Sequence, residues 1–340
     1  MLFLLIVNTI FFTCSFIIMN RHDRIEDKNP RNNEGLTPLH EAVSSGHYEL
    51  SKFIVENVLD KNPASNDGKT PMHLAAQFGH LQLFTILFEN EPLLLKNPGD
   101  NEEWTPFHDA AEHGHLEICN LIIKNIFDKN SLASNGRTPF HVAAQHGHLE
   151  ICKLILEDLE GDKNPGDCAG TTPLHDAAEQ GYFEICKLIL GNDCVEKNPD
   201  DNEGKTPLHF AAKNGHIEVC ELMSKEIIDK NPEDINGQTP LHDAAENGYF
   251  DICKLILGDV EDQNPADIWG NTPLHRAARQ GHFEICRILV QNVLEKDPMN
   301  KFGETPFQCI EEDRMEEYAN MIESTETKTE PKLETENSTC

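Results

Sequence analysis

The stretch EGKTPLHFAAKNGHIEVCELM, at residues 203–223, carries the signals for two short helices and the turn between them. Thr206 is a typical helix N-cap, and Pro207 fits the first helical position, where its missing N–H costs nothing. Gly215 marks the end of this helix. The apolar side chains of 217–223 then recur at the spacing of a second helix. We therefore expect a unit built as turn, helix, turn, helix.

This unit recurs along most of the chain. Eight TPxH tetrapeptides end in histidines that follow one another at 33, 35, 33, 34, 34, 33 and 33 residues. These histidines are His40, His73, His108, His141, His175, His209, His242 and His275. A ninth, altered copy reads TPFQ at 305–308. A chain with such a period grows linearly by stacking its units, so its length does not set a domain count.

The pattern resembles the ankyrin repeat, whose units of about 33 residues carry a T-P-L-H-x-A signature. The resemblance implies an all-α fold, a curved solenoid of stacked helix-turn-helix units with β-hairpin fingers. We expect nine repeats over 27–322, a hydrophobic N-terminal segment at 1–20 and a disordered polar tail at 323–340. Glu103 stands where the other fingers have glycine, so we expect that finger to be distorted.

The composition is strongly acidic, with 59 Asp and Glu against 28 Lys and Arg and a net charge of −31. This charge repels phosphate backbones, so we expect no nucleic-acid partner. It favours association with basic protein surfaces. Acidic residues that only solvate a long surface would give the same composition, and that alternative stays open.

Six of the 11 cysteines lie 11 residues after a TPxH histidine, at equivalent sites of successive units. They are Cys119, Cys152, Cys186, Cys220, Cys253 and Cys286. Stacked helices lie about 8–10 Å apart, which is too far for a disulfide between equivalent sites. We expect reduced, buried thiols and, with them, a reducing compartment.

Position in the repeat also accounts for most of the 17 histidines. Eight end the TPxH motif, and six more follow those by seven residues. A histidine repeated at a helix start is expected to link neighbouring units by hydrogen bonds, and the resemblance implies the same. We expect no catalytic residue, cofactor or metal site. One alternative is a weak zinc ion shared by His113 and His146.

Residues that vary between units are the candidates for recognition. The resemblance implies a concave binding face made by the fingers and first helices, where residues one and four after each histidine share one face. Every second unit carries an acidic pair there: Asp109 and Glu112, Asp176 and Glu179, Asp243 and Glu246. We expect these pairs to form an acidic face for a basic partner. Duplication of a two-unit block would explain the same pattern without a function.

Aromatic side chains add to this candidate face. Trp104 and Trp269 fall in fingers, and Phe78 occupies an expected surface position. Exposed aromatic residues are enriched among binding hot spots, although local packing on the finger is the alternative.

Residues 1–19 contain no charged side chain, and 19 apolar or neutral residues are about long enough to span a bilayer. Arg21 and Arg24 follow them, which favours an anchor with the repeats in the cytosol. A cleaved signal peptide, a packed cap and a misassigned start site remain alternatives.

The sequence therefore predicts a non-catalytic adaptor or scaffold that binds a protein partner and no small-molecule substrate. A structural spacer or tether, with or without a membrane anchor, is one alternative. A regulatory subunit of a separate effector enzyme is another.

Overall fold

The computed structural model describes residues 30–92, 96–159, 162–192, 195–293, 295–310 and 314–319. The chain divides into two compact units, residues 1–168 and 169–340, which are treated separately. The segment predicted at 1–20 and the tail predicted at 323–340 lie outside the described residues, and the predicted domain 27–322 stays a prediction. Among the described residues, no helix has both the length and the apolar character needed to cross a bilayer.

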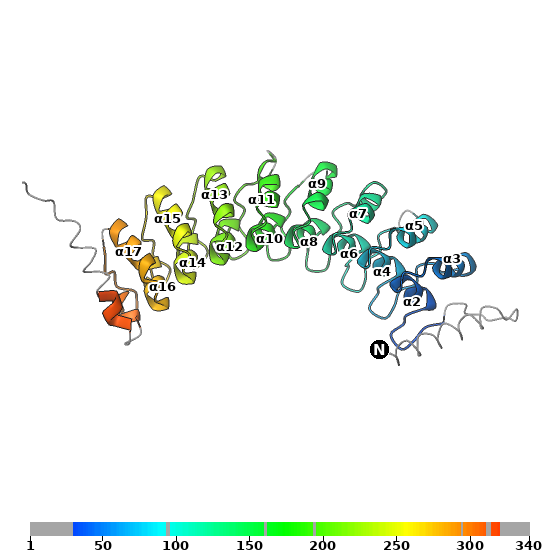
Figure 1. Cartoon of the computed structure of the whole chain (residues 1–340), viewed down its shortest axis with the longest axis horizontal. Helices are drawn as coiled ribbons and strands as arrows, with labels where there is room; N and C mark the ends of the chain where they lie inside the picture. Colours follow the sequence, from blue (N-terminus) through cyan, green and yellow to red (C-terminus); the bar gives the residue numbers. More distant parts are fainter. Residues whose placement is uncertain are drawn as a thin grey trace, which may run out of the picture. The chain divides into compact units, whose positions relative to one another are not determined.

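The first unit consists of four helix pairs (Figure 1). The first helices are α2 (Pro38–Ser44), α4 (Pro71–Gln77), α6 (Pro106–Glu112) and α8 (Pro139–Gln145). The second helices are α3 (Tyr48–Asn57), α5 (Leu81–Asn90), α7 (Leu116–Ile123) and α9 (Leu149–Asp158). Within this unit, first helices pack against first helices and second helices against second helices, in two rows.

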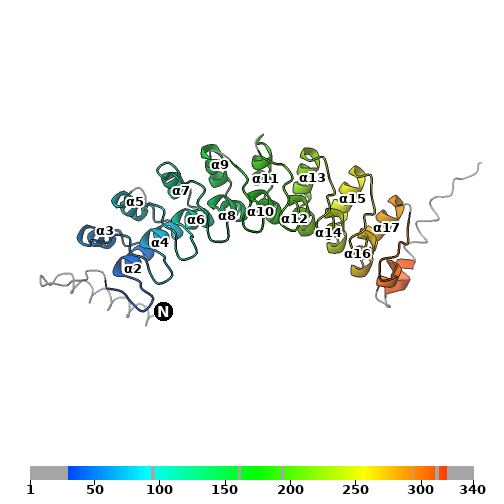
Figure 2. The same ribbon diagram turned by 180° about the vertical axis from the view of Figure 1, so that it is seen from behind.

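The second unit repeats this arrangement (Figure 2). Its first helices are α10 (Pro173–Gln180), α12 (Pro207–Asn214), α14 (Pro240–Asn247) and α16 (Pro273–Gln280). Its second helices are α11 (Phe183–Leu190), α13 (Ile217–Glu226), α15 (Phe250–Asp259) and α17 (Phe283–Asn292). A 3-10 turn, η2 (Phe307–Cys309), and a short helix at 315–319 follow. The predicted all-α solenoid of stacked units is confirmed.

Local signals set the bounds of each first helix. Thr206 is the N-cap of α12, Pro207 takes the first helical position, and Gly215 ends the helix with a left-handed φ of 81°. Leu208, Ala211 and Ala212 are fully buried. Alanine at two of these sites lets neighbouring first helices approach closely, and the buried side chains of the second helices complete the core.

The turns that precede the first helices, here called fingers, are closed by hydrogen bonds. No described residue belongs to a β-strand, so the fingers are tight turns rather than paired strands. Each finger instead donates a backbone hydrogen bond to the finger before it. Ile268 N–H donates to the Asn236 carbonyl at 2.8 Å, and Lys301 N–H donates to the Trp269 carbonyl at 2.8 Å.

The finger that contains Glu103 is not distorted, so that expectation was wrong. Glu103 takes a φ of 57°, close to the values of the glycines at equivalent sites. Its N–H donates to Asp100 at 3.0 Å, and Ser134 N–H donates to the Glu102 carbonyl at 2.8 Å. The hydrogen bonds on both sides hold the residue in the left-handed region, which costs about 1–2 kcal/mol for a residue with a side chain.

The ninth repeat closes the second unit through a few apolar contacts. Tyr318 is buried, and its ring lies 5.8 Å from that of Phe283 and 5.9 Å from that of Phe307. Arg314 donates to the Gly281 carbonyl at 3.0 Å, and its guanidinium lies over the Phe283 ring. These contacts cover the end of the eighth repeat.

The six equivalent cysteines are free thiols, and all six are fully buried. Burial raises the pKa of Cys152, Cys186 and Cys220 to about 12, which leaves almost no thiolate at neutral pH. Cys168, by contrast, is exposed and accessible to a reagent in solution. The prediction of buried, unpaired thiols is confirmed.

We expect a thiol reagent to modify Cys168 in the native chain and to leave the six buried cysteines unmodified, because only thiolate reacts readily. Mass spectrometry of peptides after labelling, with and without denaturant, measures this. Recovery of the six as disulfide-linked pairs would contradict the stacking described above.

We expect Glu103→Gly to stabilise the protein by about 1 kcal/mol, because glycine takes a positive φ without strain. The denaturant midpoint of the full chain measures the change. Glu102→Gly, one residue away and without positive φ, is the matched control and should give no gain. Equal effects of the two variants would show that Glu103 is not strained.

Candidate functional site

An Asp or Asn side chain shapes each of several fingers. In the finger 234–238, one carboxylate oxygen of Asp234 accepts from the N–H of Asn236 at 2.8 Å and of Gln238 at 2.9 Å. Equivalent bonds form at Asn32, Asp100, Asp201, Asp267 and Asn300. Sequence reasoning missed these residues, although Asp or Asn recurs five residues before the capping threonine and is suited to closing a turn in this way.

The TPxH histidines connect each first helix to the next finger. Thr239 N–H donates to His242 Nδ1 at 3.1 Å, which places the ring proton on Nε2. Nε2 then donates to the Asn271 carbonyl in the next finger at 3.0 Å. The same link, to the residue before the next capping threonine, is made by His40, His73, His108, His175, His209 and His275.

Burial keeps these rings neutral. It lowers the pKa of His73, His108, His209 and His242 to about 4, although a backbone hydrogen bond opposes the shift. A protonated ring would lose the acceptor that Thr N–H uses. The histidines therefore support the stack and are unsuited to acid–base catalysis near neutral pH.

The predicted acidic face differs from what the structure shows. Asp109 is 1% exposed and Asp176 is 2% exposed, and Asp243 is partly buried, so these carboxylates do not form an exposed row. Glu112, Glu179 and Glu246 lie at the rim and are partly exposed. Helical spacing places both residues of a pair on one face, but Trp104 and Lys69 from two fingers then cover Asp109.

Two of the covered carboxylates, Asp109 and Asp243, have cationic side chains near them. Trp104 Nε1 donates to Asp109 at 3.2 Å, and Lys69 Nζ lies 3.9 Å from the same oxygen. Burial nevertheless raises the pKa of Asp109 to about 7, against the lowering effect of Lys69. Burial raises the pKa of Asp243 to about 7 as well, against Lys213 and Lys205. These two carboxyls are therefore only partly ionised at neutral pH.

The predicted aromatic residues fall into two groups. The Trp104 ring lies 4.7 Å from the His108 ring and is only partly exposed, so it packs locally on its finger. Phe78 is 49% exposed and Trp269 is 39% exposed. The latter two keep enough free surface to contact a partner.

A groove opens on the first-helix face of the second unit, with a volume of about 490 Å³. It is lined by Lys205, His209, Phe210, Lys213, Gln238, Asp243, Glu246, Asn247 and Gln280. Asp243 and Glu246 were predicted as recognition residues, and the groove brings them together with Phe210 and two lysines. The lysines add positive charge to a face that was predicted to carry acidic pairs in every second unit.

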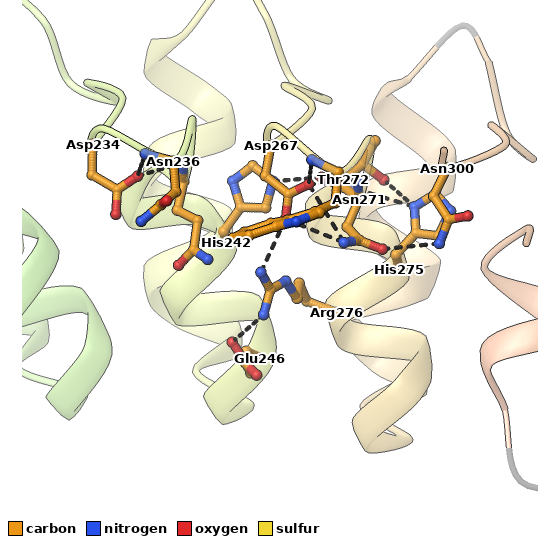
Figure 3. A network of polar contacts seen from close by, with 12 residues as sticks. Asp234, Asn236, His242, Glu246, Asp267, Asn271, Thr272, His275, Arg276 and Asn300 are labelled. Atoms are coloured by element: carbon orange, nitrogen blue, oxygen red, sulfur yellow. Dashed lines mark hydrogen bonds and ion pairs between the residues drawn. The ribbon is translucent and has the colours of Figure 1, made fainter. Parts of the chain in front are cut away.

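Beside this groove, Arg276 joins three elements of the second unit (Figure 3). Its guanidinium donates to Glu246 of α14 at 3.1 Å and to Asp267 of the finger at 3.0 Å. Burial alone would raise the pKa of Asp267, but hydrogen bonds from Asn271 and Arg276 outweigh it and hold the pKa below its usual range. The sequence showed an arginine here but not its partners.

No group of three or more metal-binding side chains occurs in the part of the chain that the structure describes. His113 and His146 each stack on a ring of their own repeat, with His115 and His148 respectively. The proposed zinc ion therefore gains no further ligand from the described residues.

Known protein-family models match most of the chain. A model for three ankyrin repeats matches residues 11–93, 60–133, 107–199 and 192–267, and a single ankyrin repeat matches 269–299. The chain belongs to the ankyrin-repeat family. No curated protein matches it. Ankyrin repeats are generally protein–protein interaction modules, and the family places this chain in that class.

We expect His242→Gln to destabilise the ankyrin stack by about 1–3 kcal/mol at pH 7.5, because the Asn271 carbonyl loses its donor. Glutamine can still accept the hydrogen bond from the capping threonine: in the ninth repeat, Gln308 accepts from Thr305 N–H at 2.9 Å. The pKa of His242 in the folded protein, about 4, lies below the ordinary histidine value of 6.5, so the stabilisation that its neutral ring provides is lost as pH falls from 6.5 to 4. The difference in Tm between wild type and variant should therefore shrink from pH 7.5 to pH 4.5. A constant difference would contradict the buried, neutral imidazole.

Proposed function

We propose that this ankyrin-repeat protein is a non-catalytic adaptor that binds a protein partner at the first-helix and finger face of residues 169–340. The observation that carries the proposal is the groove between α12, α14 and α16. Its lining includes Phe210, Lys213 and Glu246, which are exposed or partly exposed. The repeat fold does not require Phe210, Lys213 or Glu246 at their positions, because other repeats carry different residues at the equivalent positions.

The chemistry of the groove suits a polypeptide better than a small substrate. It combines an aromatic ring, amides and charges of both signs, spread along three first helices. Such a mixture gives specificity through matched polar contacts around an apolar anchor. The neutral histidines offer no general base, which agrees with a binding role.

Our proposal for the location of the protein rests on a different set of residues. Six buried thiols without partners suit a reducing compartment, so we propose that the repeats lie in the cytosol. Attachment to a membrane through residues 1–19 belongs to the same proposal.

The test is capture of partners by the full chain from the cell's own extract, followed by quantitative mass spectrometry. Lys213→Glu changes an exposed lysine of the groove, and Lys225→Glu changes an exposed lysine on α13. We expect Lys213→Glu alone to reduce capture of a specific protein by about tenfold, the effect of about 1.4 kcal/mol. Thermal melting checks that both variants stay folded.

Equal capture by wild type and both variants would show that the groove is not the binding surface. Loss with Lys225→Glu alone would move the binding surface to the second helices.

A further inference from the structure

The last three fingers carry exposed apolar side chains at their tips. These fingers, at 234–238, 267–271 and 300–304, present the two residues before their glycine to solvent. Ile235 is 66% exposed and Phe302 is 69% exposed, and Ile268, Trp269 and Met299 are exposed as well. The first six fingers have Asn, Asp, Glu, Ser, Cys or Ala at the same tip positions. The apolar tips are therefore confined to the last three repeats.

Hydrogen bonds hold these three tips in a row. Ile268 N–H donates to the Asn236 carbonyl at 2.8 Å, and Lys301 N–H donates to the Trp269 carbonyl at 2.8 Å. The helices that follow the first two of these fingers, α14 and α16, pack side by side (Figure 2). Since equivalent positions of stacked repeats point in the same direction, the exposed side chains form one strip. We call it the apolar strip, and it consists of Ile235, Ile268, Trp269, Met299 and Phe302.

The two isoleucines of the strip occupy positions where asparagine supports the stack in other repeats. Asn66 Nδ2 donates to the Asn33 carbonyl at 2.9 Å, and Asn101 Nδ2 donates to the Asn66 carbonyl at 2.9 Å. Ile235 and Ile268 align with these asparagines and keep only the backbone hydrogen bond to the finger before them. The seventh and eighth repeats therefore lack a stabilising side-chain bond and expose apolar surface in its place, which the fold alone does not favour.

Opposite charges lie at the two ends of the strip. Glu233, directly before the seventh finger, and Lys301, in the ninth finger, are both exposed. Neither takes part in an ion pair in the part of the chain that the structure describes. Glu304, also in the ninth finger, lies 4.0 Å from Arg279. The middle finger exposes no charged side chain at its tip. The strip is therefore acidic at one end, basic at the other and apolar between them.

A surface with this order of charges is complementary to itself. If a second copy is related by a two-fold axis through the middle finger, Glu233 of each copy meets Lys301 of the other, and Ile235 meets Phe302. The two middle fingers then contact each other around the axis. A parallel arrangement would place like charges together instead. In the antiparallel one, each copy continues past the other at its sixth finger, whose polar tip stays in solvent.

We propose that two copies of this chain associate through the apolar strip in this antiparallel arrangement. The inference goes beyond the proposed function and does not depend on it, because the strip shares no residue with the groove. The net charge of −31 opposes the approach of two copies, so salt that screens this repulsion favours the dimer. The strip is a small interface, and we expect a Kd on the order of 10 µM.

The test is sedimentation velocity of the full chain, with a reductant that keeps exposed Cys168 from forming disulfides between copies. Ile235→Asn introduces the asparagine of other repeats, so the variant should keep the thermal stability of the wild type. We expect about tenfold weaker dimerisation, since the change occurs twice in a two-fold dimer. Ile228→Asn removes a fully exposed isoleucine outside the fingers and is the matched control, with an expected wild-type Kd.

Exchange of the end charges tests the antiparallel arrangement. Glu233→Lys and Lys301→Glu should each weaken dimerisation by about tenfold, because each variant places like charges together at two symmetric contacts. An equimolar mixture of the two variants should form a heterodimer with the Kd of the wild type, because both contacts then pair opposite charges again. Residues 1–19 are the same in every variant, so differences between variants come from the strip.

Three results would each overturn the inference: a wild-type chain that stays monomeric at about 100 µM, equal Kd values for Ile235→Asn and Ile228→Asn, or a mixture of the charge variants that binds no tighter than either alone. A monomeric wild type whose capture of another protein is lost in Ile235→Asn would also overturn it and assign the strip to that protein. None of these results bears on the groove, which Lys213→Glu tests separately.

Discussion

One buried interaction fixes the geometry on which the other features depend. A neutral imidazole accepts the N–H of its capping threonine and donates to a carbonyl of the next finger, as His242 does with Thr239 and Asn271. The link spans 29 residues from His40 to Lys69 and from His242 to Asn271, but 31 from His73 to Trp104 and 30 from His175 to Lys205. The additional residues fall after the second helix, outside the linked segments. Loops of variable length are tolerated there because neither end of the hydrogen-bonded link moves.

The sequence predicted the features that the repeat itself determines. Helices, buried cysteines and linking histidines occupy equivalent positions, so one unit predicts the surroundings of the next. The exposure of Asp109 could not be predicted in this way, because Trp104 and Lys69 reach it from two different fingers. Helical spacing shows which residues of one helix share a face, but it does not show which side chains from other elements cover that face. The predicted distortion of the finger at Glu103 was wrong for a related reason. Hydrogen bonds within the finger and from the next finger hold the Glu103 backbone at a positive φ, although this φ is strained for a residue with a side chain.

The net charge of the chain therefore does not describe how its charged side chains are distributed. A net charge of −31 suggests repulsion everywhere, yet on the first-helix face acidic groups meet basic ones from adjacent fingers or repeats. Lys69 lies beside Asp109, whereas Arg276, at the position equivalent to Asp109, binds Glu246 of the preceding repeat. Such alternation makes equivalent sites chemically distinct while the backbone stays the same. Recognition can then differ from repeat to repeat without any change in the fold.

A partly buried carboxyl at a binding face also connects recognition to protonation. The pKa of Asp243 lies near 7 because burial outweighs the nearby lysines. A cation placed against this carboxyl favours its ionised form, so binding would release a fraction of a proton at neutral pH. The attraction would be stronger than at an exposed pair, since little water separates the charges, but part of it is spent on ionising the acid. The net affinity from one such contact is therefore modest. An adaptor built from many such contacts gains specificity from their number and order along the stack rather than from the strength of any one.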